Sequence, residues 1–234
     1  MGYAGFDFVI IDCQHSATNP IGPELENMLR AAYAADVTPI VRVSRNDEAQ
    51  ILKALDFRAK GIIVPQIASK TDVEKLVSAT RYPPQGRRSC TPGIAATKYG
   101  FRPWAGYTTQ ANAEVLAIPL VEDQDAVNHL DEILAVEGID WVHFGPFDMA
   151  VSMGLSDYAF DPQIQQYRSQ VIAACRTRHL PVMDLAWDVD SAIDFIRQGA
   201  DVIALGTDLA FLSLAVRSVT SRLKDIKAIT RGSQ

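Results

Sequence analysis

The 234-residue chain is poor in cysteine and has no long run of any one chemical character. Its three cysteines form no CxxC pair, and this odd, sparse count indicates reduced thiols and a cytoplasmic protein. No dense run of Lys or Arg is present and the net charge is −6, which argues against a nucleic-acid partner. The apolar N-terminal stretch is interrupted by Asp7 and Asp12, so we expect neither a signal peptide nor a membrane span.

Hairpin signals are also absent. No glycine-rich GxGxxG follows the first apolar run, which disfavours a dinucleotide-binding fold. Short apolar runs instead alternate with amphipathic stretches, the pattern of a parallel β/α protein. The expected strands are 6–12, 38–43, 61–65, 115–121, 141–145, 181–185 and 201–206. The expected helices are 24–35, 47–57, 71–80, 126–134, 163–178, 191–198 and 208–226.

Seven strands separated by helices fit either a (β/α)₈ TIM barrel with one unit missing or a large doubly wound sheet. We favour the barrel, because polar residues end the strand runs and a barrel brings them to one mouth. These residues are Asp12, Arg42, Gln66, Glu122, Asp148, Asp184 and Thr207. Residues 1–234 are expected to form this single domain. The longest break, 81–113, is expected to be a loop with a short helix that covers the mouth or joins a subunit contact.

Glu122 and Asp148 carry the strongest functional signal. Each closes an apolar run, AEVLAIPLVE for the first and IDWVHFGPFD for the second, and they lie one β/α unit apart. Either acid alone could cap a following helix. Their matched placement favours a shared role as oxygen ligands for a hard divalent cation. The backbone N–H groups of Phe147 and Asp148, after Pro146, are candidates for holding a substrate carboxylate.

Three further residues complete the candidate site. His15 follows the first strand, and a histidine side chain at this place could move protons at neutral pH. Arg42 ends the second strand and needs an anionic partner, either an internal carboxylate such as Asp12 or a substrate carboxylate or oxyanion. Asp56 lies near a helix C-terminus, where an acid is unfavourable, and orienting His15 would compensate. No lysine ends an apolar strand run, so a Schiff-base mechanism is not expected.

Several stretches together resemble the class II, metal-dependent pyruvate aldolases of the HpcH/HpaI family, such as 4-hydroxy-2-oxoheptanedioate aldolase and 2-dehydro-3-deoxyglucarate aldolase. The stretches include AGFDFVIIDCQHSATN, PIVRVSRND, GIIVPQI, ATRYPPQGRRS, LVEDQDAV, VEGIDWVHFGPFDMAVSMG and GADVIALGTD. The resemblance covers nearly the whole chain. It implies a (β/α)₈ barrel that cleaves a 4-hydroxy-2-oxo acid to pyruvate and an aldehyde through a metal-stabilised enolate.

The resemblance also assigns roles. It makes Glu122 and Asp148 the ligands of a divalent metal, Mg²⁺, Mn²⁺ or Co²⁺, and makes Arg42 the group that steadies the enolate. It pairs His15 with Asp56 as a proton relay and implies that substrate binds to Arg42 and the N–H groups of Phe147 and Asp148. It further implies a homo-oligomer, a hexamer built from dimers, with the C-terminal helices exchanged between subunits.

The chain departs from the family pattern at Gln14, Leu120, Phe147 and Ala96. Phe147 and Leu120 predict a tighter and less polar aldehyde pocket. The chain also begins without the first strand and helix of the family, which predicts unpaired barrel edges. Two alternatives remain. One is an acyl-CoA hydroxy-acid lyase of the same fold, which would need the sparse arginines 87, 88 and 102 to bind CoA. The other is a degenerate barrel that acts as an oligomer scaffold.

Overall fold

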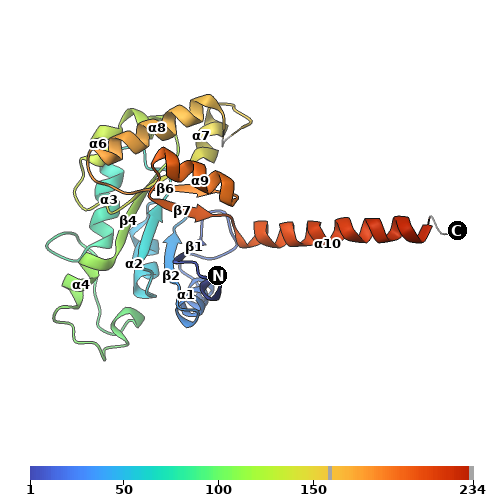
Figure 1. The fold of residues 1–234 in the computed structure, drawn as a ribbon. Coiled ribbons are helices and arrows are strands. Elements are labelled where there is room, and N and C mark those ends of the chain that lie inside the picture. The colour runs from blue at the N-terminus through green and yellow to red at the C-terminus, as the bar shows by residue number, and fades with distance from the viewer. Residues whose placement is uncertain (158–159, 232–234) are drawn as a thin grey trace.

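The computed structural model describes residues 1–157 and 160–231 as an alternation of strands and helices (Figure 1). The strands are β1 (Phe8–Asp12), β2 (Thr38–Arg42), β3 (Gly61–Val64), β4 (Leu116–Val121), β5 (Val142–Phe144), β6 (Val182–Ala186) and β7 (Val202–Leu205). The α-helices are α1 (Pro23–Ala34), α2 (Glu48–Asp56), α3 (Lys70–Thr80), α4 (Tyr107–Glu114), α5 (Gln124–Asn128), α6 (Leu130–Leu134), α7 (Pro146–Ser152), α8 (Pro162–Arg176), α9 (Val189–Gln198) and α10 (Asp208–Arg231). Short 3₁₀ turns are η1 (Gly2–Ala4) and η2 (Ala95–Thr97).

All seven predicted strands are present, with ends shifted by at most two residues. They pair in parallel in the order β1 to β7, which is the order of the chain. The sheet curls into a nearly closed β/α barrel of the TIM type, and Phe8 of β1 reaches the ring of Trp141 beside β5, with 6.2 Å between ring centroids. Within the described residues, β1 and β7 each pair with one neighbour only. All strand carboxyl ends therefore open on one side, called the mouth below.

Two hydrophobic layers hold the barrel together, because successive side chains of a strand point to opposite faces. The inner layer fills the barrel with Ile40, Ile63, Ile118, Leu120, Met183 and their neighbours. The outer layer joins the strands to the surrounding helices. Both faces of β2 to β6 are thus largely buried, whereas β1 and β7 are half-buried, and all seven strands read as short apolar runs in the sequence.

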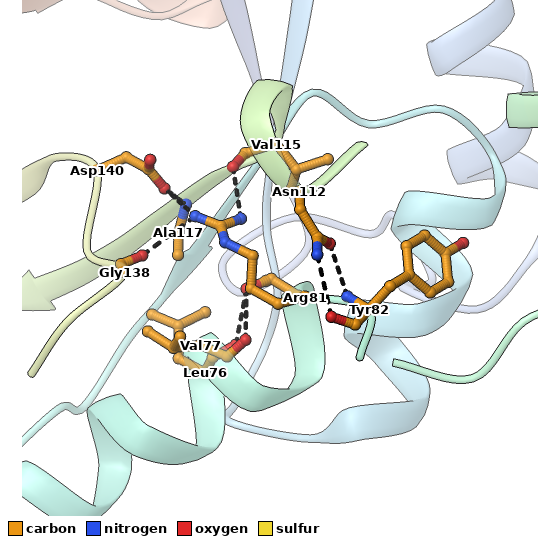
Figure 2. A network of polar contacts seen from close by, with 10 residues as sticks. Leu76, Val77, Arg81, Tyr82, Asn112, Val115, Ala117, Gly138 and Asp140 are labelled. Atoms are coloured by element: carbon orange, nitrogen blue, oxygen red, sulfur yellow. Dashed lines mark hydrogen bonds and ion pairs between the residues drawn. The ribbon is translucent and has the colours of Figure 1, made fainter. Parts of the chain in front are cut away.

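The segment 81–113 lies at the barrel end opposite the mouth. Its length and composition predict a loop that covers the mouth or joins a subunit contact. The segment follows helix α3 rather than a strand, so within one chain it does not cover the mouth, and the subunit contact stays a prediction. Arg81 donates hydrogen bonds to the carbonyls of Val115 and Gly138 and forms an ion pair with Asp140 (2.5 Å) (Figure 2). These partners immediately precede β4 and β5, so the contacts tie the start of the segment to the amino ends of two strands.

Helix α10 differs from the other helices because it leaves the barrel and projects away from it (Figure 1). It is one continuous helix over Asp208–Arg231, although the sequence permits a break. Large apolar side chains along it are exposed, namely Leu209, Leu212, Leu214, Val216, Val219 and Leu223. A helix with this much exposed apolar surface is typical of an interaction site.

Candidate active site

The structure brings Glu122 and Asp148 together at the mouth. Glu122 follows β4 directly and is 4% exposed, and its Oε1 accepts a hydrogen bond of 2.7 Å from the backbone N–H of Gln66, which lies beyond β3. Asp148 lies in the first turn of α7 and is exposed. Burial, together with the charge and hydrogen-bonding contact of Asp148, raises the pKa of Glu122 to about 7, although the Gln66 N–H and the charge of Arg42 act in the opposite direction. The two carboxyl groups therefore share one environment.

Gly145 makes this arrangement possible. It is the N-cap of α7, and a Cβ atom at this position would lie 2.7 Å from Cβ of Glu122 and 3.4 Å from its Oε2. A contact under 3 Å forces a shift, so any other residue at position 145 would push the Glu122 carboxylate aside. The sequence GP before Phe147 therefore serves two purposes: glycine makes room for Glu122, and Pro146 at the first helical position starts α7.

A divalent cation fits the carboxylate pair formed by Glu122 and Asp148. Both donors are hard oxygens, and a cation would offset the burial of Glu122 and the nearby charge of Asp148, which both raise its pKa. The described residues contain no group of three or more His, Cys, Asp or Glu side chains arranged for a metal. Two protein ligands are in keeping with ions such as Mg²⁺, which keep several positions for water and substrate oxygens.

Arg42 extends from β2 and is held by Asp12 of the neighbouring strand, directly opposite it in the register. Its Nε and Nη2 atoms donate to the two carboxylate oxygens of Asp12 at 2.8 and 2.7 Å. Burial tends to raise the pKa of Asp12, but these bonds and the N–H groups of Gln14 and His15 outweigh it and the pKa is lowered. The internal carboxylate expected as one alternative partner of Arg42 is thus present. The charge of Arg42 also reaches Glu122, whose pKa it lowers.

His15 and Asp56 are not brought together within one chain. His15 is exposed in the loop after β1, where its backbone N–H bonds to Asp12. Asp56 ends α2, and Lys60, which follows, bonds to Pro39 near the start of β2, at the barrel end opposite the mouth. Asp56 pairs there with Arg88 at 3.3 Å. Burial raises the pKa of Asp56, and Arg88 opposes this shift.

A cavity of about 230 Å³ with both aromatic and polar walls lies next to the start of α7, and its polar wall residues are Arg168, Asp188 and Ser191. Its walls include Phe147, Leu185, Trp187 and Phe195, and Phe147 packs edge-on against Trp187 with 5.7 Å between ring centroids. Phe147 adjoins Asp148 in the chain, so the cavity borders the mouth.

His143 is a buried residue that the sequence pattern alone classifies as structural. It lies in the middle of β5 between two outward-facing residues, so strand alternation directs it into the barrel. Burial lowers its pKa to about 3, with a further contribution from the charge of Arg42. The alternation of side chains along the run WVHFG is the sequence signal that places His143 inside the barrel.

The arginines available for a CoA-binding surface lie away from the mouth. Arg88 is 4% exposed and bound to Asp56, with its guanidinium over the ring of Tyr82. Arg102 lies over the ring of Tyr107 of α4. Both belong to the segment 81–113 at the opposite barrel end, so within one chain they do not border the carboxylate pair. In the described part of the chain, no helix has both the length and the apolar character that crossing a membrane requires.

Comparison with known proteins gives a family match over most of the chain. The model of the HpcH/HpaI aldolase/citrate lyase family matches residues 1–215. The chain is 31% identical over 229 residues to the 2-dehydro-3,6-dideoxy-6-sulfogluconate aldolase of Pseudomonas putida, covering 97% of this chain and 88% of that protein. It is also 31% identical to the 2-keto-3-deoxy-L-rhamnonate aldolase of Salmonella gallinarum, covering 97% of this chain and 84% of that protein.

A solved structure shares the fold closely. An HpcH/HpaI aldolase/citrate lyase family protein from Burkholderia cenocepacia superposes with a TM-score of 0.88 at 29% identity, covering 95% of this chain and 88% of that one. The similarity therefore extends through the barrel and includes the segments that carry the carboxylate pair.

Proposed function

Because the chain belongs to the HpcH/HpaI aldolase/citrate lyase family, we propose that it is a metal-dependent lyase that cleaves a 4-hydroxy-2-oxo acid to pyruvate and an aldehyde. Its aldolase relatives support carbon–carbon lyase activity. The observation that carries the finer proposal is the convergence of Glu122 and Asp148 in one environment within reach of the Arg42 charge. This set suits a class II pyruvate aldolase, because a cation and a guanidinium stabilise the negative charge that develops on an oxo oxygen.

Glu122 and Asp148 would hold the cation, which is Mg²⁺, Mn²⁺ or Co²⁺ in this proposal. When bound, such an ion acts as a Lewis acid toward the 2-oxo group of the substrate. The protein side of the site is organised for this role, since the Gln66 N–H fixes one oxygen of Glu122 and Gly145 leaves space for the other. The N–H groups of Phe147 and Asp148 are proposed to bind the substrate carboxylate.

Arg42 has the clearest part in the chemistry. Cleavage removes the proton of the 4-hydroxyl group, breaks the C3–C4 bond to release the aldehyde, and leaves the electron pair in the enolate of pyruvate. Asp12 orients the guanidinium through two bonds, and Arg42 stabilises the enolate oxygen. His15, exposed at the mouth, moves the proton that leaves the 4-hydroxyl and the proton that later reaches C3.

The aldehyde is proposed to lie on the side of Phe147. The cavity bordered by Phe147 and Trp187 would receive the part of the substrate beyond C4. Its aromatic walls suit an apolar substituent, and the side chains of Asp188 and Ser191 in the same walls offer partners to a hydroxyl group.

A second copy of this chain is the proposed partner. The exposed apolar residues of α10 support an exchange of C-terminal helices between subunits in a homo-oligomer, as in the hexamers that the family resemblance implies. The separation of His15 from Asp56 points the same way. Since the two residues lie toward opposite barrel ends in one chain, the proposed proton-relay pair requires Asp56 from a neighbouring subunit. The cytoplasm, where reduced cysteines persist, is the proposed location.

Proton exchange tests the proposed function without knowledge of the aldehyde. The protein is incubated with pyruvate and MgCl₂ in D₂O, and the methyl protons are followed by NMR. We expect exchange that stops on addition of EDTA and returns with excess Mg²⁺. Absence of exchange with Mg²⁺, Mn²⁺ and Co²⁺ would contradict the proposal and favour a scaffold. Exchange that resists EDTA and is abolished by borohydride would reveal a Schiff-base lysine instead.

A further inference from the structure

His143 is a polar side chain within the apolar filling of the barrel. It lies opposite Leu120 of β4 and Met183 of β6, which both belong to the inner layer. Its neighbours Val142 and Phe144 pack in the outer layer, so the imidazole occupies the inside. The residue is 6% exposed, and its Nδ1 atom makes no hydrogen bond with any described residue. Buried polar groups are nearly always paired, so this one requires an explanation.

Two observations place His143 directly beneath the carboxylate pair and Arg42. The first is electrostatic, since the charge of Arg42 acts on the imidazole. The second is steric. Gly145 is the next inward position of the same chain segment, and a Cβ there would lie 2.7 Å from Cβ of Glu122 and 3.0 Å from Cδ1 of Leu120. The Glu122 side chain therefore crosses above His143, and no side chain from position 145 separates His143 from the mouth.

Arg42 contributes an unused donor to the same interior. Its Nε and Nη2 atoms bond to Asp12, whereas Nη1 makes no hydrogen bond within the described residues. The guanidinium comes from β2 and the imidazole from β5, so these groups approach from two walls of the barrel. An oxygen atom placed between the walls could accept hydrogen bonds from both.

We propose that His143 is a substrate-binding residue, which donates a ring N–H hydrogen bond to an oxygen of the bound 2-oxo acid alongside Arg42. This inference rests on the proposed function, because the 2-oxo acid is the ligand that both groups bind. A neutral imidazole adds a donor without adding charge to a site that already holds a guanidinium and two carboxylates. Burial and the adjacent guanidinium both keep the ring neutral. The unpaired Nδ1 costs stability in the free protein and gains its partner when substrate binds.

Four variants test this role. His143→Phe keeps an aromatic ring but removes both nitrogens. His143→Asn and His143→Gln place an amide near the positions of Nδ1 and Nε2, respectively. Met183→Leu is the matched control, since it changes packing in the same layer without changing hydrogen bonds. Each protein is assayed for Mg²⁺-dependent exchange of pyruvate methyl protons, and its melting temperature is measured.

For His143→Phe we expect exchange to fall about 10- to 100-fold, as for a lost hydrogen bond to a charged group. One of the two amide variants should recover roughly 10-fold of this loss, and Met183→Leu should stay within about 2-fold of the wild type. The melting temperature of His143→Phe should equal or exceed that of the wild type, because a buried unpaired polar group is gone.

Three outcomes would overturn the inference or separate it from the proposed function. Wild-type exchange by His143→Phe overturns it. Equal losses in His143→Phe and Met183→Leu, with lower melting temperatures, assign His143 to packing and also overturn it. If the wild type itself exchanges no protons, the proposed function fails. The ¹⁵N chemical shifts of His143 on addition of pyruvate and MgCl₂ then test whether His143 contacts the oxo acid. A shift supports contact with the oxo acid, and no shift refutes it.

Discussion

The two ends of the barrel each carry an Arg–Asp pair, and the pairs use their polar groups differently. At the barrel end opposite the mouth, called the closed end below, the side chain of Arg81 is 5% exposed. It donates hydrogen bonds to Asp140 and to two backbone carbonyls (Figure 2). At the mouth, Arg42 has a 23% exposed side chain, and its partner Asp12 engages only Nε and Nη2. The contacts of Arg81 join parts of the fold, whereas Arg42 keeps Nη1 as a donor for a ligand.

This difference teaches how to separate structural from chemical polar groups in a β/α barrel. Arg81 bonds to residues just before β4 and β5, so its loss would free the amino ends of two strands. Glu122 instead has a raised pKa beside a second carboxylate, an arrangement that opposes stability unless a cation is bound. The contacts of Arg81 therefore stabilise the fold at one barrel end, and the carboxylate pair of the proposed chemistry lies at the other.

The largest effect should come from removing a carboxylate at the mouth. Glu122→Gln and Asp148→Asn should each lower Mg²⁺-dependent exchange of pyruvate protons roughly 10³-fold, at the upper end of the loss for one oxyanion-stabilising group. The unfolding free energy should stay the same or rise, since the repulsion within the carboxylate pair is relieved. Exchange rates and urea denaturation curves measure the two effects. A variant that loses stability and activity in parallel would place Glu122 among the structural groups.

Replacing Arg81 at the closed end should lower stability and leave exchange activity nearly unchanged. Arg81→Met should lower the unfolding free energy by about 3 kcal/mol, because Asp140 loses its partner and two carbonyls lose a donor. Exchange per folded molecule should remain within about 2-fold of the wild type, since the change lies far from the reacting groups. Urea denaturation and active-site-normalised rates are the measurements. A loss of specific activity in the fully folded variant would contradict the division between the two ends.

Arg42→Lys sharpens the comparison at the mouth. Lysine keeps the charge but cannot bind Asp12 through two donors and still offer a third in a fixed plane. Exchange should fall about 10- to 100-fold, whereas stability should change by less than about 1 kcal/mol, because the ion pair is partly exposed. Glu26, which pairs with Arg30 on the surface of α1, offers a control, and Glu26→Gln should change neither quantity. Equal rates for Arg42→Lys and wild type would remove Arg42 from the reaction.

The smallest effect concerns pH. The folded pKa of Asp12 lies below its ordinary value of 3.8, so its ionised form stabilises the fold above that value. This contribution is lost as the pH falls through the folded pKa. Asp12→Asn should therefore be less stable than the wild type by about 1 kcal/mol at pH 7, and the difference should shrink toward pH 3. Denaturation at several pH values tests it, and a gap that does not depend on pH would exclude the charge as its source.

Much of the fold follows from the order of apolar runs. Each strand packs apolar side chains on both faces and therefore appears as a short apolar run, so all seven strands are predictable within two residues. The prediction that 81–113 covers the mouth does not hold within one chain, because length and composition do not reveal which barrel end a loop occupies. The order of elements reveals it: a segment that follows a helix such as α3 leads to the start of the next strand and therefore lies at the end where strands begin. Helix α7 escaped prediction as a helix because only seven residues separate Gly145 from Met153.

The sequence predicts the location of a site residue only where that residue ends or follows a strand. Glu122, Asp148 and Arg42 each follow or end a strand, and the barrel brings them to the mouth. The pairing of Asp56 with Arg88 spans 32 residues and depends on how the loop folds back, which no local pattern records. His143 could be placed inside the barrel by alternation, but its unpaired nitrogen emerges only from the packed structure.

Manganese binding tests the central claim most directly, because Mn²⁺ is observed by EPR whether or not a substrate is known. Free Mn²⁺ is measured during titration of the wild type, Glu122→Gln, Asp148→Asn and the surface control Glu26→Gln. We predict one site per chain in the wild type and the control, and its loss in both mouth variants. Unchanged Mn²⁺ binding in Glu122→Gln and Asp148→Asn would contradict the assignment of the mouth as the cation site.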